Sequence, residues 1–593
     1  MKPGFPIPRM SEDVRGSALT GQKDGRTIIR AKDAYLISNG VFMNRASRCK
    51  NFLLLVTVWM AATLAARTQT FTTLTSFDYS NGSNPAAPPA QGIDGNFYGS
   101  TSLGGMNTYG TIFKITPQGD LSILYEFCAL ANCSDGAEPG QPLLLTTDGN
   151  FYGTTGVGGG STACPSGCGT VFKLSPNGTL TTLHRFSFLD GYGPHGLIQG
   201  YDGALYGVTV LGGFNGAGTI FRMTLDGQVT TLYTFCSQAG CADGSYPSGK
   251  LLQGVDGSFY GVTVEGGTHI CEGFSCGTVF RLSRSGKLTT LEDFDGTEGI
   301  EPRSGMIEGS DGMFYGVTNT TIFELTARGR LRTLHRFNRT EGGPSGPLVQ
   351  ATDGNLYGTS SDGGLDNCRY GCGTLFNLST SGLATVYAFC PQQGCADGSF
   401  PEGGLIQSTT GLFYGTSLGF GANGYGTVYN LDMGLGPFVA LVRGSGKVAA
   451  IQGILGQGFT GATQVAINGL TANFSVVSDT YLTATIPNGA TTGFVTVTTP
   501  SGTLQSNVPF RVLPQLLSFD PPSGPPGTQV TITGVSLMQT LGVGFGDRTP
   551  AQFTVNSDTS VTATVPQGAK TGKIGIETKG GVAISSGTFE VTE

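Results

Sequence analysis

The sequence predicts an all-β protein whose larger part is a β-propeller, and a repeated phrase is the main observation behind this prediction. An Asp-Gly turn, a hydrophobic residue before Tyr-Gly, and then Gly-Thr-aliphatic-Phe recur seven times from residue 94 onward. A fixed period of this size indicates a repeat architecture. The composition agrees, because 97 glycines and only 12% charged residues suit a chain of many tight turns. The turns begin at Asp94, Asp148, Asp202, Asp256, Asp311 and Asp353, with a degenerate copy at Thr410.

Each repeat is predicted to contain four short strands. In residues 248–294 they are KLLQGV, SFYGVTV, GTVFRLS and KLTTLEDF, in which apolar and β-branched residues alternate with small or polar ones. Two of the three hairpins are tight, at the Asp-Gly of 256–257 and the Ser-Gly of 285–286. Such dipeptides tolerate the positive φ angles of two-residue hairpin turns. Repeated four-strand units are typical of the blades of a β-propeller.

The number of blades follows from counting fourth strands. The seventh unit ends at residues 426–432 without a fourth strand, and an unassigned copy of that strand, TFTTLTSF, lies at 70–77. We therefore expect the N-terminal strand to complete the last blade. The expected propeller spans residues 69–434 and has seven blades, with six or eight as alternatives.

The loops differ between the two faces of this propeller. The first and third hairpins of every blade are tight and share one face, whereas the second hairpins and the crossovers between blades share the other, which we call the long-loop face. Binding residues tend to lie on loops held by a rigid scaffold. We expect ligand binding on the long-loop face, at residues that do not repeat: Tyr192, His195, Tyr246, His269 and Tyr370.

Aromatic side chains beside carboxylates on these loops would suit a sugar or a calcium-assisted ligand. The alternative concerns Cys-x4-Cys-[Ser/Ala]-Asp-Gly-x-x-Pro, which recurs at 128–139, 236–247 and 390–401. In a recurring turn of this kind, the aspartate is expected to accept hydrogen bonds from nearby backbone amides. We therefore predict no cofactor and assign no metal-binding residues. A structural calcium ion is the alternative.

Twelve of the 13 cysteines form six close pairs, which predict local disulfides. Loops of other repeats that lack one cysteine of a pair lack both, as a bridge within the loop requires. A zinc site is the alternative, but the spacings are loose and an exported chain meets an oxidising compartment. The expected bridges are Cys128–Cys133, Cys164–Cys168, Cys236–Cys241, Cys271–Cys276, Cys368–Cys372 and Cys390–Cys395.

The N-terminal region predicts export. Residues 1–42 are polar and are interpreted as a non-native extension, with Met43 as the expected true start. Residues 43–68 combine a basic stretch, a short apolar run and small residues, which is the pattern of a secretory signal peptide. A membrane anchor is the alternative, but the run is shorter than the ~20 apolar residues of a spanning helix. The expected location is extracellular or on the cell surface.

The sequence contains no recognisable catalytic constellation. Only four histidines are present, and two of them, His184 and His335, occupy a strand position that tyrosine fills in other repeats. Catalytic Asp and Glu residues need no sequence motif, so an enzyme that uses loop carboxylates stays an alternative. A non-enzymatic function is the preferred interpretation. The net charge of −7 gives no basic surface for nucleic acid.

After the repeats, residues 437–513 and 514–593 align with each other. The second copy contains PPSGPPGTQVTITG, then NSDT and VPQGA, and in these motifs it resembles the IPT/TIG immunoglobulin-like domain. The first copy shares SDT and IPNGA but lacks the opening prolines. The resemblance implies two immunoglobulin-like β-sandwiches. Through DGNFYGTT (148–155) and GTVFKLSPNGTLTTL (169–183), the repeats resemble the GloVer-type (choice-of-anchor-like) family of exported bacterial proteins, which implies location but no activity.

These observations together predict a secreted or cell-surface binding or adhesion protein. Its expected partner is a glycan, a wall polymer or a cell-surface protein, bound on the long-loop face, with no nucleic acid and no membrane span after signal cleavage. The alternatives are an extracellular polysaccharide-active hydrolase or lyase and a purely structural spacer. The sequence does not indicate an oligomeric state.

Overall fold

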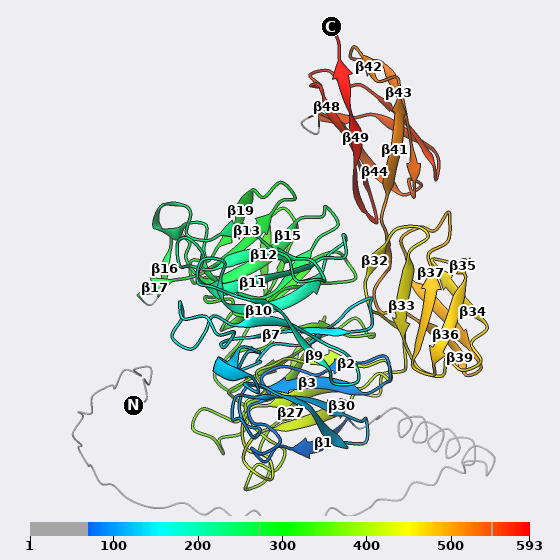
Figure 1. The fold of residues 1–593 in the computed structure, drawn as a ribbon. Helices are drawn as coiled ribbons and strands as arrows, with labels where there is room; N and C mark the ends of the chain where they lie inside the picture. Colours follow the sequence, from blue (N-terminus) through cyan, green and yellow to red (C-terminus); the bar gives the residue numbers. More distant parts are fainter. Residues whose placement is uncertain (1–68, 272, 547–548) are drawn as a thin grey trace, which may run out of the picture. The chain divides into compact units, whose positions relative to one another are not determined.

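The computed structural model describes residues 69–271, 273–546 and 549–593, and Arg67–Glu593 forms one compact unit (Figure 1). The predicted extension, the predicted signal peptide and Cys49 lie outside the described residues. Regular structure in the described residues is almost entirely β, with two short 3-10 turns at Ala131–Cys133 and Ala239–Cys241. Within these residues no helix is long and apolar enough to cross a membrane.

The repeat region forms seven four-stranded antiparallel sheets, which we call blades 1 to 7. Blades 1 to 3 contain β2 (Ala90–Gln91), β3 (Phe97–Thr101), β4 (Thr111–Ile115), β5 (Leu121–Glu126); β6 (Leu144–Leu145), β7 (Phe151–Thr155), β8 (Thr170–Leu174), β9 (Leu180–Arg185); and β10 (Tyr192–Gln199), β11 (Leu205–Leu211), β12 (Thr219–Met223), β13 (Val229–Thr234). Blades 4 and 5 contain β14 (Ser245–Gln253), β15 (Phe259–Glu265), β18 (Thr278–Leu282), β19 (Leu288–Asp293); and β20 (Ile307–Glu308), β21 (Phe314–Val317), β22 (Thr321–Leu325), β23 (Leu331–Arg336). Blades 6 and 7 contain β24 (Val349–Gln350), β25 (Leu356–Ser360), β26 (Thr374–Ser379), β27 (Gly382–Ala388); and β28 (Ile406–Gln407), β29 (Phe413–Ser417), β30 (Thr427–Asp432), β1 (Thr70–Ser76). A short hairpin, β16 (Ile270–Cys271) with β17 (Phe274–Ser275), extends from blade 4.

The N-terminal strand completes the last blade. β1 pairs antiparallel with β30, with Thr70 opposite Asp432 and Ser76 opposite Thr427. The completion of the last blade by the N-terminal strand, inferred from counting, is therefore confirmed. Blade 7 also meets blade 1 through Tyr414 and Phe97, whose rings stack with centroids 3.8 Å apart.

One aromatic contact recurs at every junction between consecutive blades. A phenylalanine just after the fourth strand of one blade packs on an aromatic ring in the third strand of the next, with ring centroids 5.1–5.7 Å apart. Rings at this separation in tilted or edge-to-face geometry attract each other beyond the gain from burial. The seven pairs form a closed cycle: Phe127–Phe172, Phe186–Phe221, Phe235–Phe280, Phe294–Phe323, Phe337–Phe376, Phe389–Tyr429 and Phe77–Phe113.

This contact explains the glycine in the repeated Tyr-Gly. In blade 4, a β-carbon added at Gly261 would lie 2.5 Å from Cζ of Phe280. The corresponding glycines of the other blades face the aromatic ring of their third strand in the same way, at 2.4–2.7 Å. The ring that joins two blades therefore lies directly over a glycine, and no other residue leaves room for it.

The tyrosine of the same motif closes the Asp-Gly turn. In blade 2, the hydroxyl of Tyr152 donates a hydrogen bond to Asp148 at 2.9 Å, and Lys173 forms an ion pair with the same carboxylate at 3.1 Å. Burial alone would raise the pKa of Asp148, but the hydrogen bonds from Thr146, Asn150 and Lys173 hold it well below its usual value. The tyrosine and the glycine of the repeated Tyr-Gly thus both have a structural role.

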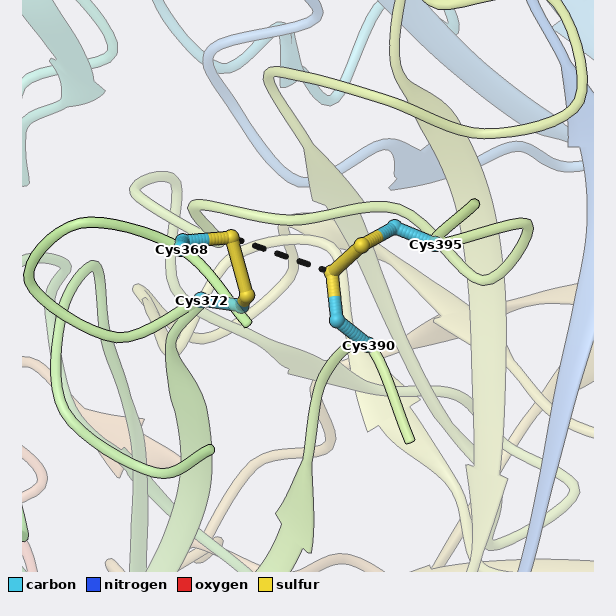
Figure 2. A group of neighbouring side chains, drawn as sticks. All are labelled: Cys368, Cys372, Cys390 and Cys395. Carbon is cyan, nitrogen blue, oxygen red and sulfur yellow. Dashed lines mark hydrogen bonds between the residues drawn. A yellow bond between two sulfur atoms is a disulfide. The ribbon is translucent and has the colours of Figure 1, made fainter. Parts of the chain in front are cut away.

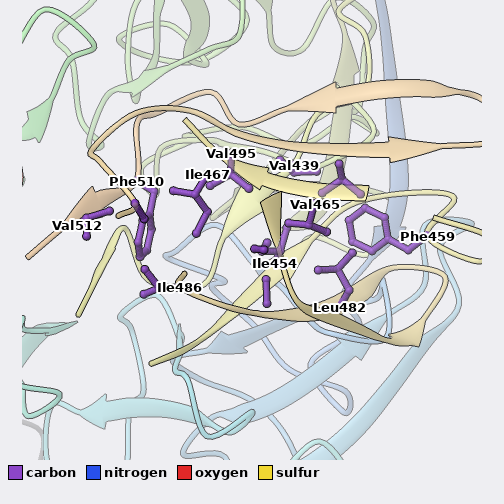
Figure 3. Packing of buried hydrophobic residues seen from close by; sticks show 14 residues of the cluster. Val439, Ile454, Phe459, Val465, Ile467, Leu482, Ile486, Val495, Phe510 and Val512 are labelled. Atoms are coloured by element: carbon purple, nitrogen blue, oxygen red, sulfur yellow. The ribbon is translucent and has the colours of Figure 1, made fainter. Parts of the chain in front are cut away.

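The C-terminal region forms two β-sandwiches. The first contains β31 (Ala440–Leu441), β33 (Ile451–Leu455), β37 (Tyr481–Thr485) and β36 (Phe474–Ser478) against β35 (Leu470–Ala472), β34 (Gln464–Ile467), β38 (Val495–Thr499) and β39 (Gly502–Gln505), with β32 (Ser445–Gly446) parallel to β40 (Arg511–Val512). The second contains β41 (Gln515–Asp520), β43 (Gln529–Val535), β47 (Ser560–Thr564) and β46 (Phe553–Ser557) against β42 (Ser523–Gly524), β49 (Gly581–Val591), β48 (Gly572–Thr578), β44 (Thr540–Phe545) and β45 (Thr549–Ala551). Figure 3 shows the core of the first sandwich, where Val465, Leu482 and Phe510 are fully buried.

Side chains of the first sandwich contact the tight-turn side of the propeller. The Thr480 hydroxyl donates to the carbonyl of Ile93 at 2.9 Å, next to the first Asp-Gly turn. Arg511 donates to the Tyr201 hydroxyl at 2.6 Å and forms an ion pair with Glu308. These contacts involve the face opposite the long loops.

Removing the closing strand should destabilise the whole propeller. A chain that begins after Asp78 lacks β1 and Phe77, so β30 has an unpaired edge and Phe113 loses its partner ring. Relative to a chain that begins at Gln69, we expect a loss of at least ~3 kcal/mol, the typical cost of removing one buried phenylalanine. The exposed edge should also favour association. Thermal unfolding and size-exclusion chromatography measure both effects, and equal midpoints with equal elution would contradict ring closure by β1.

Adding one methyl group beneath the interblade ring should also be destabilising. We expect Gly261→Ala to lower the free energy of unfolding by ~1–3 kcal/mol, because overpacking forces Phe280 to move. Gly436→Ala is the matched control, because a β-carbon there meets no atom within 4 Å. Chemical denaturation measures both values. If the two variants are equally stable, the glycine is not required by the ring.

Candidate functional site

The long loops are held by local disulfides and buried aspartates. All six predicted bridges are present, between the pairs expected from the sequence. Asp135 is buried and accepts hydrogen bonds from the Tyr125 hydroxyl at 2.8 Å and from the amides of Ala129 and Leu130. Asp243 makes the equivalent contacts in its own loop, and Asp397 accepts hydrogen bonds from the Tyr387 hydroxyl and the Cys390 amide. These aspartates therefore serve the turn, as the alternative interpretation expected, and calcium binding stays a prediction.

The five predicted site residues lie in two kinds of environment. His269 and Tyr370 lie outside the blade strands and are exposed, as expected. Tyr192, His195 and Tyr246 are half-buried and belong to the innermost strands β10 and β14, so their assignment to loops was wrong. The first strand of these two blades extends further toward the long-loop face than the sequence pattern indicated. No hydrogen bond, ion pair or ring contact joins any two of these five described residues.

A proline marks where each blade begins on the long-loop face. In six of the seven blades this proline packs against the preceding blade, at the glycine that comes just before that blade's third strand. A β-carbon added at this glycine would lie 2.4–2.8 Å from the Cδ atom of the proline. Its position is therefore structurally equivalent around the propeller. The residue that follows it differs from blade to blade, and we call these residues the inner ring: Ala86, Gly140, His195, Ser248, Arg303, Ser345 and Glu402.

Neighbouring members of the inner ring are in contact. The Ser248 hydroxyl donates to the carbonyl of Arg303 at 2.7 Å, and the Ser345 hydroxyl donates to the carbonyl of Pro401 at 3.0 Å. The backbones also approach closely, because a β-carbon at Gly346 would lie 2.8 Å from the carbonyl oxygen of Glu402. The inner segments of successive blades thus hold these side chains near one another.

The residue before the proline adopts a strained conformation in most blades. Its φ angle is between 52° and 58° in five blades, a left-handed region that side chains other than glycine rarely adopt. The amide of each donates to a carbonyl of the preceding blade, as from Tyr246 to Ala217 at 2.9 Å, which fixes this conformation. Such strain costs ~1–3 kcal/mol per residue and is concentrated at functional sites. The five residues are Asn84, Glu138, Tyr246, Glu301 and Phe400.

The charged members of this region influence one another. Arg303 is well exposed, with 66% of its side chain accessible, and forms an ion pair with Glu301 at 2.6 Å. Partial desolvation raises the pKa of Glu402 although the residue as a whole is exposed, and the nearby Arg303 partly opposes this shift. Burial also lowers the pKa of Lys250, which follows the inner ring in blade 4. Glycine or proline fills the equivalent position in the other blades, so Lys250 is the single cation at that level of the ring.

Sequence reasoning assigned only His195 of the inner ring as a binding residue and named Glu402 only among the loop carboxylates, although a signal for the whole ring was available. Aligning the repeats on the proline, not on the Asp-Gly turn, places His195, Ser248, Arg303, Ser345 and Glu402 in one column. The turn-based alignment displaces His195 from this column, because the segment between His195 and Asp202 is one residue shorter than in the other repeats.

The described residues also line a cavity of about 580 Å³ on the tight-turn side. Its propeller lining includes Asp202, Tyr206 and Arg222, which bond to one another in the Asp-Gly turn of blade 3. Because those side chains already stabilise the turn, we assign no function to this cavity.

The imidazole of His195, half-buried as a side chain but largely removed from water by its surroundings, should make stability depend on pH. Burial lowers the pKa of His195 to about 4, below the ordinary value of 6.5. Between these values the unfolded chain binds a proton that the folded chain does not, so stability is lost as the pH falls from 6.5 toward 4. Relative to His195→Gln, the wild-type chain should lose more stability over this interval and none above it. Denaturation of both chains across the interval measures this difference, and parallel curves would contradict a buried neutral His195.

The chain was compared with protein families and with known proteins. Residues 61–269, 160–321 and 318–462 match the model of the Gloeobacter/Verrucomicrobia repeat, and residues 514–592 match the IPT/TIG domain. No curated protein matches the chain.

Solved structures with a similar fold are distant in sequence. Streptogramin B lyase matches at 16% identity and a TM-score of 0.42, over 61% of this chain and 97% of the lyase. The extracellular domain of a candidate one-component system from B. thetaiotaomicron matches at 9% identity and a TM-score of 0.43, over 87% of this chain and 59% of that domain. A surface glycan-binding protein from Prevotella bryantii matches at 16% identity and a TM-score of 0.20, over 26% of this chain and 39% of that protein. Likenesses of this size assign no activity.

The family assignment rests on the repeats. The repeat model matches residues 61–462, more than half of the chain, and covers all seven blades. The chain therefore belongs to the Gloeobacter/Verrucomicrobia repeat family and carries a C-terminal IPT/TIG domain.

Proposed function

We propose that this protein is a secreted or cell-surface binding protein whose long-loop face binds a glycan or wall polymer through the inner ring. One observation carries the proposal. At equivalent backbone positions, the propeller holds Ala, Gly, His, Ser, Arg, Ser and Glu in successive blades. A residue that the fold requires repeats in every blade, as the interblade rings do, whereas the side chains of the inner ring do not.

The chemistry of the inner ring suits a polymer rich in hydroxyl groups. Arg303 supplies fixed donors, Glu402 supplies acceptors, and the neutral imidazole of His195 supplies one of each. An exposed arginine also recognises carboxylate or phosphate groups in a bidentate manner. Tyr246 and Phe400 flank the ring and offer aromatic surface for a sugar face.

Two features support action outside the cytoplasm. Six disulfides in one chain are typical of an oxidising compartment. Contacts with the first sandwich involve the tight-turn side, which leaves the long-loop face as the side without such contacts among the described residues.

A polysaccharide-active enzyme is the second candidate, and Glu402 favours it. A carboxyl group whose pKa is raised by partial desolvation is suited to donate a proton to a leaving group at neutral pH. Glu301 and Glu138 provide further carboxylates in blades 5 and 2. Turnover of a bound polymer that is lost in Glu402→Gln, with binding retained, would establish this activity.

Binding should depend on the inner ring and not on the stability of the fold. The full chain is applied to an array of cell-surface glycans and wall polymers, and Arg303→Ala, Glu402→Gln and His195→Ala should each weaken binding to the ligand that is found. Arg303→Ala is expected to cost ~1.5–3 kcal/mol of binding free energy, the range for a hydrogen bond to a charged group. Stability should change by less than ~0.5 kcal/mol for exposed Arg303.

Arg328→Ala is the matched control, because Arg328 is an exposed arginine of the same blade in the turn between β22 and β23. It should leave binding unchanged. Alanine variants of Tyr192, Tyr246, His269 and Tyr370 map how far the site extends beyond the inner ring. Equal losses in Arg303→Ala and Arg328→Ala, or binding that maps to residues 437–593, would contradict the proposed site.

A further inference from the structure

Four cysteine sulfurs meet on the long-loop face of blade 6. Cys368–Cys372 bridges the loop between β25 and β26, and Cys390–Cys395 bridges the crossover that follows β27. The two bridges face each other in Figure 2, with the Sγ atoms of Cys368 and Cys390 3.9 Å apart. All four Sγ atoms lie within 4.8 Å of one another. We call these residues the cysteine quartet.

Blade 6 is special among the described blades. Blades 1 and 3 have a cysteine pair in the following crossover only, and blades 2 and 4 have one in the loop between the second and third strands only. In the described part of the chain, the quartet is the one group of His, Cys, Asp or Glu residues close enough to hold a metal ion. The four other bridges therefore provide matched comparisons within the same protein.

The backbone around the quartet is held by contacts other than the S–S bonds. The Asn367 side chain donates to the carbonyl of Cys390 at 2.6 Å, and the amide of Cys390 donates to Asp397 at 3.0 Å. The amide of Phe400 donates to the carbonyl of Cys372 at 2.9 Å. Cys372, Cys390 and Cys395 are also buried in the core between blades 6 and 7. These contacts can keep the four sulfurs together when the bridges are open.

We propose that the cysteine quartet is a second, redox-controlled site, which binds one Zn²⁺ ion through four thiolates when both bridges are reduced. Tetrahedral zinc with Zn–S bonds of about 2.3 Å places its sulfurs about 3.8 Å apart, close to the 3.9 Å between the Sγ atoms of Cys368 and Cys390. The spacings Cys-x3-Cys and Cys-x4-Cys, although loose, still lie within the range of structural zinc sites. The site thus has two states: two disulfides without metal, and four thiolates with metal.

The change of state balances with an ordinary thiol reductant. Each bridge accepts two electrons and two protons from one dithiol, which becomes a cyclic disulfide, so two dithiols yield four cysteine thiols. Zinc then displaces the four thiol protons as the Zn–S bonds form. The two sulfurs of each opened bridge move apart to become separate ligands, while the loops that carry the two pairs are already adjacent.

Metal binding by the reduced chain tests the proposal. The full chain is reduced with a trialkylphosphine, which becomes the phosphine oxide with oxygen from water and leaves no competing thiol. Co²⁺ is then added as a spectroscopic substitute for Zn²⁺. We expect thiolate-to-cobalt charge-transfer bands and the intense visible bands of tetrahedral cobalt, at one equivalent per chain, and their loss on addition of Zn²⁺. The oxidised chain should show neither.

Paired variants separate the quartet from the other cysteines. Cys368→Ser/Cys372→Ser and Cys390→Ser/Cys395→Ser should each abolish the tetrathiolate spectrum. Cys164→Ser/Cys168→Ser removes an isolated bridge of the same spacing and should retain it. Zn²⁺ should also raise the thermal midpoint of the reduced wild-type chain and of this control, but not of the quartet variants.

Three results would overturn the proposal. They are a reduced wild-type chain without the tetrathiolate spectrum, a spectrum that survives in a quartet variant, and a reduced chain that loses its fold and does not regain it with Zn²⁺. Circular dichroism before and after reduction reports the last of these. The outcome is independent of glycan binding, because the quartet contains no member of the inner ring.

Discussion

The aromatic contact between consecutive blades is the interaction on which the propeller depends. A phenylalanine after each fourth strand packs on a ring in the third strand of the next blade, and the last of these contacts joins Phe77 to Phe113 across the point of closure. Fully burying a side chain of this size contributes ~1.5–3 kcal/mol. Because the contact recurs at every junction, the blades stabilise one another in a cycle, and the glycine beneath each ring is required for the same reason.

This division between repeated and unrepeated residues has a functional consequence. Rings, glycines and prolines hold the backbone in one geometry in every blade, so the residue after the proline is free to vary. His195, Arg303 and Glu402 therefore occupy equivalent positions with different charges. The strained residues beside them, such as Tyr246 and Glu301, keep their conformation because an amide hydrogen bond to the preceding blade fixes it.

The disulfides complete this arrangement without holding the propeller together. Each bridge closes a ring of only a few residues. The lower chain entropy of the unfolded state then stabilises the folded state by only ~2 kcal/mol per bridge. They stiffen the long loops that surround the inner ring, and buried aspartates such as Asp243 do the same where they receive the loop amides. In blade 6, two such loops are neighbours, which is what brings four sulfurs into one site.

The sequence by itself determined the strands, the tight turns, the six cysteine pairs and the exchange of the N-terminal strand. These features repeat, and a repeat makes each blade a comparison for the others. It also predicted the role of Asp135, because local hydrogen bonds need only nearby residues. The sequence did not place Tyr192, His195 and Tyr246 on strands, because the length of β10 and β14 depends on pairing with the next strand. Only the tertiary structure brought Arg303 within electrostatic range of Glu402 and Cys368 beside Cys390. Proximity between loops of different strands follows from how the blades pack and leaves no periodic signal in the chain.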